Sequence, residues 1–277
     1  MAAHALHTAT PDLLARVDVV LVRPSHPGNV GACARAMRVM GLRNLSLVAP
    51  RHADVAAHPD AIAFASSATD VLAGARSFDT LAAALAHATL AIAVSADARE
   101  FAPGPVAPEE AVRAALAELH AHAAHRVAFV FGTERTGLSI DDAQRCQALC
   151  SIPGEPGYHS LNLSQAVQLL AYLLRREALA PGAGAPQAGA GIGAGIGAGA
   201  PQRPPHATQA SIEALYEHLE RALVAIGFLD PAHPKKLMPR LRRLLGRARL
   251  EVEEVDLLRG VCTEAERTAA RAARQPR

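Results

Sequence analysis

Short apolar runs alternate with longer segments of helical periodicity as far as about residue 180. The apolar runs cover residues 17–22, 45–48, 90–94, 127–131 and 149–152, and Pro, Gly or polar residues bound each of them. Continuous apolar runs of this length are typical of strands that are buried on both faces. The pattern therefore predicts strands in the interior of a sheet.

Three other segments carry the features of helices. Residues 27–40 begin with Pro-Gly and end before a glycine, residues 108–120 begin with Pro-Glu-Glu, and residues 162–177 repeat leucine and valine at helical spacing. Strands that alternate with helices favour a parallel sheet with helical crossovers. The predicted fold class is α/β.

The composition changes abruptly after the last of these helices. Residues 180–205 consist mostly of Gly, Ala and Pro, with almost no large side chain that could pack. Such a segment is typical of a flexible linker. The chain is therefore predicted to comprise an α/β domain in residues 1–179, this linker, and a small helical module in residues 206–277.

The overall composition excludes several classes of protein. The chain has 277 residues, of which 50% are hydrophobic and 19% charged, so it can form a sizeable core and is neither a disordered nor a collagen-like chain. It contains no run of about 18 strongly apolar residues, and its first residues lack the pattern of a signal peptide. We expect a soluble, cytoplasmic protein that does not enter a membrane.

Cysteine and histidine offer little sign of a metal site. Among Cys33, Cys146, Cys150 and Cys262 only the middle two are close in sequence, and no second ligand pair accompanies them. Buried free thiols are the simpler interpretation. The run His-Ala-His-Ala-Ala-His in residues 120–125 has no evident acidic ligand cluster beside it, so we expect no metal.

The most strongly charged segment lies in the helical module. PKKLMPRLRRLLGRARL, residues 234–250, contains seven basic residues and no acidic one, while its leucines form an apolar stripe. A basic helix face suits the phosphate backbone of a nucleic acid. The alternative is a solvated face that is balanced by the acidic residues 251–256.

Three loops follow predicted strands, at the edge where open parallel sheets place their ligands. The first, residues 24–35, contains Asn29 and Arg35, with glycines that would let the backbone approach a ligand; a turn and helix start would look the same. It lacks the GxGxxG spacing of a dinucleotide site.

The second loop, residues 132–138, places Glu134 and Arg135 between two glycines, which fits either a functional site or a surface turn. The third, residues 153–165, follows an irregular Pro- and Gly-rich path to Ser160 and Asn162. The alternative for Ser160 is a purely structural role as the N-cap of the following helix.

Together the three loops resemble, in order and spacing, the motifs of the SPOUT superfamily of RNA 2′-O-ribose methyltransferases. The matching segments are HPGNVGACARAMRVMGLRNLSLV, FGTERTGLS and IPGEPGYHSLNLSQAVQLLAYLL. The segment YEHLERALVAIGFLDPAHPKKLMPRLRRLLGRARL is similar to the C-terminal extension of the TrmJ branch, which methylates the ribose at position 32 of the tRNA anticodon loop.

The resemblance implies a SPOUT-type parallel sheet with a C-terminal trefoil knot, followed by a helical, basic, tRNA-binding module. It also implies a homodimer, S-adenosylmethionine as cofactor and tRNA as substrate. The catalytic residues implied are Arg35, Asn29, Glu134, Ser160 and Asn162. The cofactor contacts implied are Val94, Ser95, Ala96, Gly132, Ile152, Ser160, Leu161, Asn162 and Leu163. The RNA contacts expected are Arg35, Lys235, Lys236, Arg240, Arg243 and Arg247.

Some roles follow from the chemistry of these side chains. A guanidinium stays protonated in proteins, so we assign Arg35 to a phosphate beside the target ribose and not to proton removal. Asn29 is expected to orient Arg35 or the ribose, and Glu134 to fix its loop and pair with an arginine. At Val94 and Asp97 the chain departs from the Thr and Arg common in the family, so a side-chain hydroxyl is lost at position 94.

The sequence leaves other functions open. The enzyme could methylate another tRNA position or rRNA, since the catalytic motifs are shared across the superfamily. A catalytically inactive RNA-binding protein is a further alternative, and the presence of all five implied catalytic residues counts against it. A dinucleotide-dependent oxidoreductase lacks its glycine fingerprint.

Overall fold

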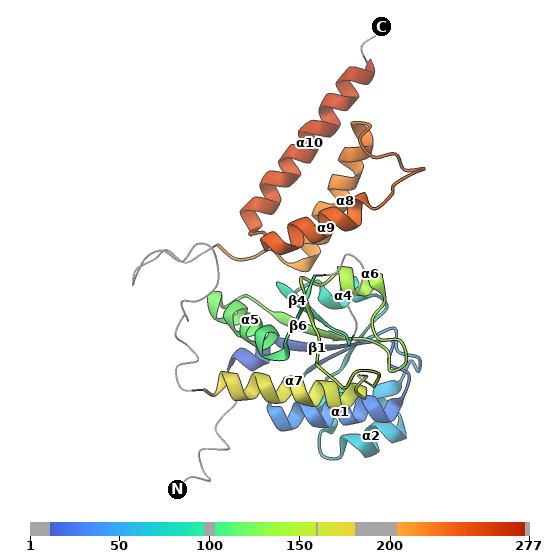
Figure 1. Cartoon of the computed structure of the whole chain (residues 1–277), viewed down its shortest axis with the longest axis vertical. Coiled ribbons are helices and arrows are strands. Elements are labelled where there is room, and N and C mark those ends of the chain that lie inside the picture. Colours follow the sequence, from blue (N-terminus) through green and yellow to red (C-terminus); the bar gives the residue numbers. More distant parts are fainter. Residues whose placement is uncertain (1–11, 97–102, 159, 181–203, 275–277) are drawn as a thin grey trace, which may run out of the picture.

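The structure is a computed structural model that describes residues 12–96, 103–158, 160–180 and 204–274. Within these residues lies a seven-stranded sheet in the order β3-β2-β1-β6-β4-β7-β5, and every neighbouring pair is parallel (Figure 1). The strands are β1 (Val17–Val22), β2 (Asn44–Val48), β3 (Arg76–Phe78), β4 (Leu90–Val94), β5 (Pro105–Val106), β6 (Val127–Phe131) and β7 (Ala148–Cys150). The predicted parallel α/β sheet is confirmed.

Each predicted strand is present, although β7 ends at Cys150 and not at residue 152. The additional strands β3 and β5 have only three and two residues and lie partly exposed, so they give no apolar run in the sequence. The helix predicted for residues 27–40 has the expected bounds, whereas the last one is shifted by one residue because Asn162 is its N-cap.

The helices include several short ones that the pattern did not predict. They are α1 (Pro27–Met40), α2 (Pro59–Ala65), α3 (Thr69–Ala73), α4 (Leu81–Leu85), α5 (Pro108–Ala121), α6 (Ile140–Gln144), α7 (Leu163–Ala178), α8 (Gln209–Ala225), α9 (Leu237–Ala248) and α10 (Val252–Arg274), with 3-10 turns at Asp12–Arg16 and Val55–Ala57. None of the helices in the described residues is long and apolar enough to cross a membrane.

The sheet lies between two helical layers of unequal size. Alternate strand residues point to opposite faces, so Val19 and Leu21 of β1 pack toward α1, α5 and α7, while Val20 and Val22 join a smaller core under α4 and α6. Figure 1 shows α1 and α7 side by side beneath the sheet and α4 and α6 above it. Because all the strands are parallel, their carboxyl ends lie at one edge of the sheet, and the loops that follow them gather there.

The helices α8, α9 and α10 stand on the α4 and α6 side of the sheet (Figure 1). They share a small core that includes Leu215, Leu250 and Val255. The backbone N–H of Gln209 donates to the carbonyl of Ala88 at 2.9 Å, so the start of α8 is attached to the segment before β4. Most of the linker predicted for residues 180–205, namely residues 181–203, lies outside the described residues, as does Asp97.

Gly31 corrects one expectation about the first loop. A Cβ at Gly31 would stand 2.0 Å from the carbonyl oxygen of Ala61, so this glycine allows α1 and α2 to pack backbone against backbone. It does not serve the approach of a ligand. The first loop is largely helix α1, which begins at Pro27 and contains both Asn29 and Arg35.

Candidate active site

A cavity of about 450 Å³ opens at the carboxyl ends of β4, β6 and β7. Its lining combines residues that follow these three strands with the first turn of α7. They are Val94, Ser95, Ala96, Phe131, Gly132, Thr133, Glu134, Arg135, Thr136, Gly137, Ile152, Ser160, Leu161, Leu163 and Ala166. This volume and mixed polarity are typical of a pocket for a small organic ligand.

The pocket gathers all the residues predicted to contact the cofactor except Asn162. Asn162 instead caps α7, where its side-chain oxygen accepts the backbone N–H of Ser164 at 2.9 Å. Ser160 lies in the wall of the cavity and does not cap α7, so the alternative that it is an N-cap is wrong. The pocket also includes Arg135, a candidate residue of the second loop, and Thr133 and Thr136, which the sequence pattern does not indicate.

The loop after β6 forms one wall of the cavity through a tight turn. The backbone of Thr133 exchanges two hydrogen bonds with that of Gly137, at 3.1 and 3.0 Å, and Gly137 has a positive φ of 65°. A Cβ at Gly132 would stand 2.0 Å from the carbonyl carbon of Gly137. Only glycine at position 132 lets the loop close in this way.

We therefore expect Gly132→Ala to displace the loop and to weaken binding of S-adenosylhomocysteine by roughly tenfold or more, because the clash is with backbone and side-chain rotation cannot relieve it. Calorimetric titration measures this. Gly104→Ala, where an added Cβ meets nothing within 4 Å, is the matched control. Equal affinities in the two variants would contradict the role of the loop in the pocket.

Glu134 points out of this loop and fastens it to the start of α1. Its carboxylate accepts hydrogen bonds from the Ser25 N–H at 3.0 Å, the Ser25 hydroxyl at 2.8 Å, the His26 N–H at 3.1 Å and the Asn29 side-chain amide at 3.2 Å. Burial would raise the pKa of Glu134, but the hydrogen bonds from its own backbone, Ser25 and Asn29 outweigh burial and lower it. Glu134 is thus a charged anchor and a poor proton acceptor at neutral pH.

These contacts correct the expectation that Glu134 pairs with an arginine. Its partners in the described residues are backbone amides, a hydroxyl and a side-chain amide. Ser25 and His26 were not singled out from the sequence. Their part in the site depends on the approach of the loops after β1 and β6, two neighbouring strands that are far apart in sequence.

Asn29 connects Glu134 to the start of α7. It donates to Glu134, and its side-chain oxygen accepts the Asn162 amide at 3.1 Å. The polar chain Glu134, Asn29, Asn162 therefore joins the three predicted loops. In the described residues Asn29 bonds these two residues and not Arg35, contrary to one of the two roles expected for it.

Arg35 lies further along α1 and is exposed. It is six residues beyond Asn29, which corresponds to about 9 Å along the helix axis. Arg35 does not line the cavity. The structure thus brings Asn29, Glu134, Ser160 and Asn162 together around the pocket and leaves Arg35 outside it, on the surface.

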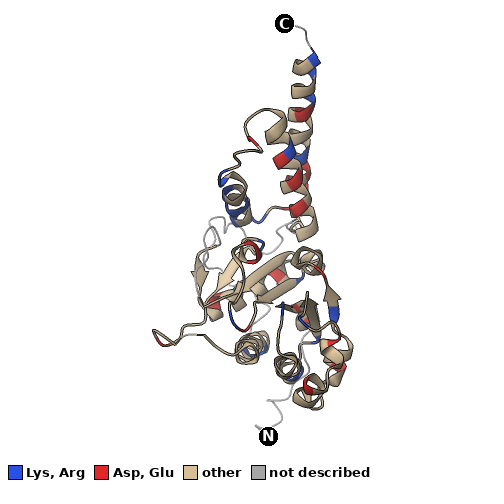
Figure 2. Cartoon of the chain, turned by 90° about the vertical axis from the view of Figure 1, so that its right-hand side faces the viewer, with Lys and Arg blue, Asp and Glu red and all other residues tan. Residues whose placement is uncertain are grey.

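The basic segment divides into inward and outward side chains. Arg242 makes two hydrogen bonds to the carboxylate of Glu213, at 2.6 and 2.8 Å, and Arg249 approaches Glu118 at 2.8 Å. Arg240, Arg243 and Arg247 are exposed and recur at helical spacing on α9, and Lys235 and Lys236 are exposed just before it. Figure 2 shows Lys and Arg, in blue, along much of α9.

The structure corrects two predictions about side chains that were made from the sequence. Leu244 is 53% exposed, so it does not belong to the apolar stripe of α9. The histidine run does have an acidic neighbour, since Glu118, His125 and His206 lie close enough together to hold an ion. The four cysteines are buried and free, as expected.

Comparison with known proteins agrees with this arrangement. The SpoU rRNA Methylase family model matches residues 16–172, and the model of the tRNA methyltransferase TrmJ C-terminal domain matches residues 210–275. The chain belongs to the SpoU methylase family of RNA methyltransferases, in its TrmJ group.

Individual relatives support this family membership over nearly the whole length of the chain. The tRNA (cytidine/uridine/adenosine-2′-O-)-methyltransferase TrmJ of Pseudomonas aeruginosa is 43% identical over 93% of this chain and 96% of its own. The tRNA (cytidine/uridine-2′-O-)-methyltransferase TrmJ of Yersinia pestis is 41% identical over 92% and 93%. The crystal structure of TrmJ from Z. mobilis superposes with a TM-score of 0.73 at 32% identity, covering 90% of this chain and 98% of that one.

Proposed function

We propose that this protein transfers a methyl group from S-adenosylmethionine to the 2′-hydroxyl of the ribose at position 32 in the anticodon loop of tRNA, where the nucleotide is cytidine or uridine. The observation that carries the proposal is the cavity at the sheet edge, with Asn29, Glu134 and Asn162 joined beside it. The TrmJ relatives named above act on tRNA ribose hydroxyls, which supports the substrate class. Such an enzyme would work in the cytoplasm, where tRNA is found.

The pocket suits S-adenosylmethionine in size and in lining. Leu161, Leu163 and Ile152 offer apolar surface, and the loop that closes tightly against Gly132 forms one wall. When bound, S-adenosylmethionine supplies an electrophilic methyl group. The residues Val94, Ser95 and Ala96 would hold it largely through their backbone, so the missing hydroxyl at position 94 is no obstacle.

The protein's own residues would then position the ribose. Transfer to a hydroxyl requires that the reacting atoms approach in line, so the loops around the pocket must hold fixed positions. Glu134 fixes the loop after β6 to α1, and the bond between Asn29 and Asn162 holds α1 to the start of α7. Arg35, outside the pocket, would bind the phosphate next to the target ribose.

We also propose that the segment after β7 forms the trefoil knot of the superfamily. The order of strands supports this, because β7 inserts between β4 and β5, both of which precede it in the chain. The Pro- and Gly-rich residues after β7 then lead to α7, which lies in the helical layer of α1 and α5, on the other side of the sheet from α6. A knot is rare enough in proteins that only the family resemblance suggested it.

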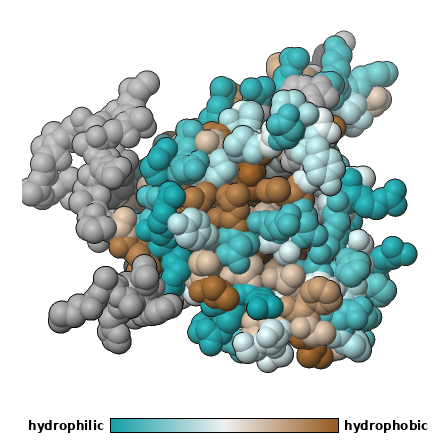
Figure 3. Space-filling model, turned by 60° about the horizontal axis from the view of Figure 1, so that its bottom comes forward, coloured by the Kyte–Doolittle hydropathy of each residue, from teal (hydrophilic) through white to brown (hydrophobic). Residues whose placement is uncertain are grey.

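The protein is further proposed to act as a homodimer through the face formed by α1, α2 and α7. Exposed apolar residues lie on these helices: Val39, Ile62, Phe64 and Tyr172. Figure 3, which views the molecule from this side, shows hydrophobic residues grouped on it. Contiguous exposed apolar surface is typical of a contact between proteins.

We expect Phe64→Glu to dissociate the dimer and to reduce methyl transfer in parallel, because a charge would be buried in the contact. Sedimentation velocity at the concentrations of the activity assay measures the first effect. Phe228→Glu, on a residue that is 68% exposed in the helical module, is the matched control. A Phe64→Glu monomer with full activity would contradict the proposal.

The proposed reaction is tested directly by incubating the purified protein with labelled S-adenosylmethionine and unmodified tRNA, followed by mapping of the methylated nucleotide. Methylation at position 32 is the expected result. Methylation of rRNA or of another tRNA position would favour the alternative that the enzyme acts on one of those substrates. Binding of tRNA without methyl transfer would favour the inactive RNA-binding protein.

A further inference from the structure

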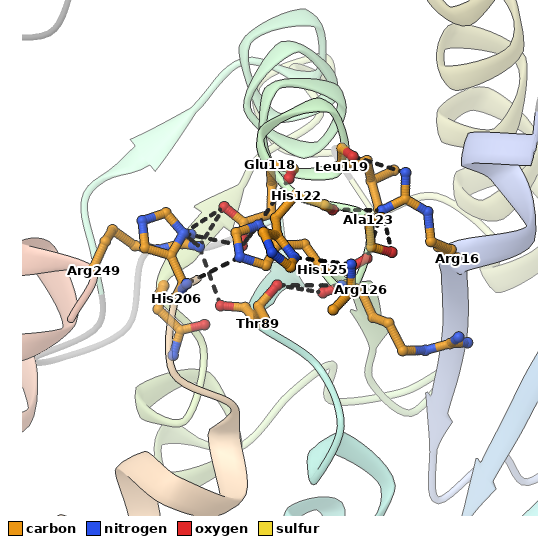
Figure 4. Close-up of polar contacts among 12 residues, drawn as sticks. Arg16, Thr89, Glu118, Leu119, His122, Ala123, His125, Arg126, His206 and Arg249 are labelled. Carbon is orange, nitrogen blue, oxygen red and sulfur yellow. Dashed lines mark hydrogen bonds and ion pairs between the residues drawn. The ribbon is translucent and has the colours of Figure 1, made fainter. Parts of the chain in front are cut away.

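A buried polar cluster joins the catalytic domain to the three C-terminal helices (Figure 4). It contains Glu118 of α5, His125 before β6, His206 in the segment leading to α8, and Arg249 at the end of α9. Glu118 and His125 are only 5% and 2% exposed, although both belong to residue types that favour water. None of these four residues lines the active-site cavity.

Arg249 and His206 both bind the carboxylate of Glu118. Arg249 approaches it at 2.8 Å and also donates to the carbonyl of Thr89 at 3.1 Å, while His206 Nδ1 lies 3.0 Å from it. Burial would raise the pKa of Glu118, but the hydrogen bond from His206 and the charge of Arg249 outweigh it and lower this pKa to about 2. The carboxylate is therefore charged, and its two partners from the C-terminal part stabilise that charge.

The position of His125 follows from its two hydrogen bonds. Its Nε2 accepts the backbone N–H of His206 at 3.0 Å, so the proton of the neutral ring is on Nδ1, which donates to the carbonyl of Glu118 at 3.0 Å. The rings of His125 and His206 stack with centroids 5.1 Å apart. Arg16 holds the end of α5 by donating to the carbonyls of Leu119 and His122, at 2.8 and 2.9 Å.

The same residues could suggest a metal centre, but their contacts favour a closed protein network. Both ring nitrogens of His125 have partners, and the guanidinium of Arg249 already neutralises the carboxylate that a cation would need. Arg249 also lies 3.4 Å from Nδ1 of His206. A metal ion would have to displace this guanidinium.

We propose that Arg249 and Glu118, with His125 and His206, are positioning residues that fix α9 on the catalytic domain so that its outward arginines face the same tRNA as the pocket. This inference rests on the proposed function. Its physical basis is that Arg249 ends the very helix that carries Arg240, Arg243 and Arg247, and that its αL conformation at φ 54° directs the side chain inward to α5.

The attachment of the C-terminal helices to the catalytic domain, here called docking, is expected to be sensitive to acid. The groups around His125 from every neighbouring element are Glu118, His122, Arg16, Arg126, His206 and Arg249. Burial lowers the pKa of His125 below its ordinary value of 6.5. The docked state therefore prefers the neutral ring, and docking weakens as the pH falls below about 6.5, because a second ring proton would face the N–H of His206.

Hydrogen exchange of the full chain without tRNA measures how readily the C-terminal helices separate from the catalytic domain. The amides of Gln209 and Ala210 donate across the contact to Ala88 and Ala86, at 2.9 and 3.2 Å, so their exchange reports its opening. We expect Arg249→Gln to speed their exchange by roughly tenfold or more, because it leaves Glu118 buried without its ion-pair partner. Arg249→Lys should restore part of the protection. Arg259→Gln, which removes an exposed arginine of α10, should change nothing.

The variant Glu118→Gln distinguishes a positioning role of the buried cluster from a direct contact between the cluster and RNA. It removes a negative charge, so simple electrostatics predicts equal or tighter tRNA binding. We expect the opposite: a roughly tenfold higher KM for tRNA with kcat and the KM for S-adenosylmethionine nearly unchanged, and no larger loss when Glu118→Gln and Arg249→Gln are combined. His125→Gln should remove the acid sensitivity of the exchange.

Three results would overturn the inference. One is unchanged exchange at Gln209 and Ala210 in Arg249→Gln. Another is unchanged or tighter tRNA binding in Glu118→Gln. The third is one-to-one binding of zinc chloride to the wild type that is lost in His206→Ala, which would make the cluster a metal centre. Failure of the proposed function is distinct, because the exchange experiment needs neither tRNA nor catalysis.

Discussion

Arg35→Ala is expected to lower the rate of ribose methylation by roughly a hundredfold or more while the affinity for S-adenosylhomocysteine stays nearly unchanged. The reason is geometric: Arg35 is exposed on α1 and does not line the cavity, so it can bind RNA but not the cofactor. Loss of the phosphate contact would misplace the ribose, and in-line transfer is sensitive to such errors. Single-turnover methylation and calorimetry measure the two quantities.

The companion variants of Arg35 sharpen this prediction. Arg35→Lys should also be poor, because an ammonium cannot replace a bidentate contact to phosphate. Arg38→Ala, one turn further along α1, is the control, since Arg38 pairs with Asp70 on the protein surface at 2.9 Å. A large loss of cofactor affinity in Arg35→Ala, or full activity, would contradict the assignment.

The triple variant Arg240→Ala, Arg243→Ala, Arg247→Ala is expected to weaken tRNA binding by roughly tenfold or more at low salt. These side chains are exposed at helical spacing on α9, and each would neutralise one phosphate. The slope of log affinity against log salt should therefore fall by about one for each lost contact. Filter binding over a salt series measures it, and cofactor binding should not change.

A matched triple variant on α10 removes the same charge elsewhere. Arg259, Arg271 and Arg274 are exposed, and alanine at these positions should leave the salt slope nearly unchanged. Equal slopes for the α9 variant and the wild type would mean that the basic residues form only a solvated face. Deleting the C-terminal helices is a less specific test, because it would also remove Arg249 and His206 from the buried Glu118.

Much of the candidate site could be predicted because parallel strands bring their carboxyl ends to one edge. The sequence placed Asn29, Glu134 and Asn162 in loops after three strands, and the structure joins them by hydrogen bonds. The partners of Glu134 could not be predicted in the same way. Ser25 acts chiefly through a backbone N–H and a hydroxyl, and nothing in its neighbourhood in the sequence indicates a carboxylate 109 residues away.

The basic segment shows where sequence patterns stop being informative. Arg242 and Arg249 occur in the same run as the outward arginines, but they pair with Glu213 and Glu118. Glu118 is in another part of the chain, 131 residues before Arg249, so only the fold reveals that pairing. The grouping of Glu118 and His125 with His206 could not be predicted for the same reason, because His206 is 81 residues beyond His125.

The proposed reaction is tested in cells by mapping ribose methylation in total tRNA from a strain that lacks this protein, with and without the gene restored. We expect the 2′-O-methyl group at position 32 to disappear, to return with the wild-type gene and not to return with Arg35→Ala. If position 32 stays methylated in cells without the protein, or if only another position loses its methyl group, the proposed function is wrong.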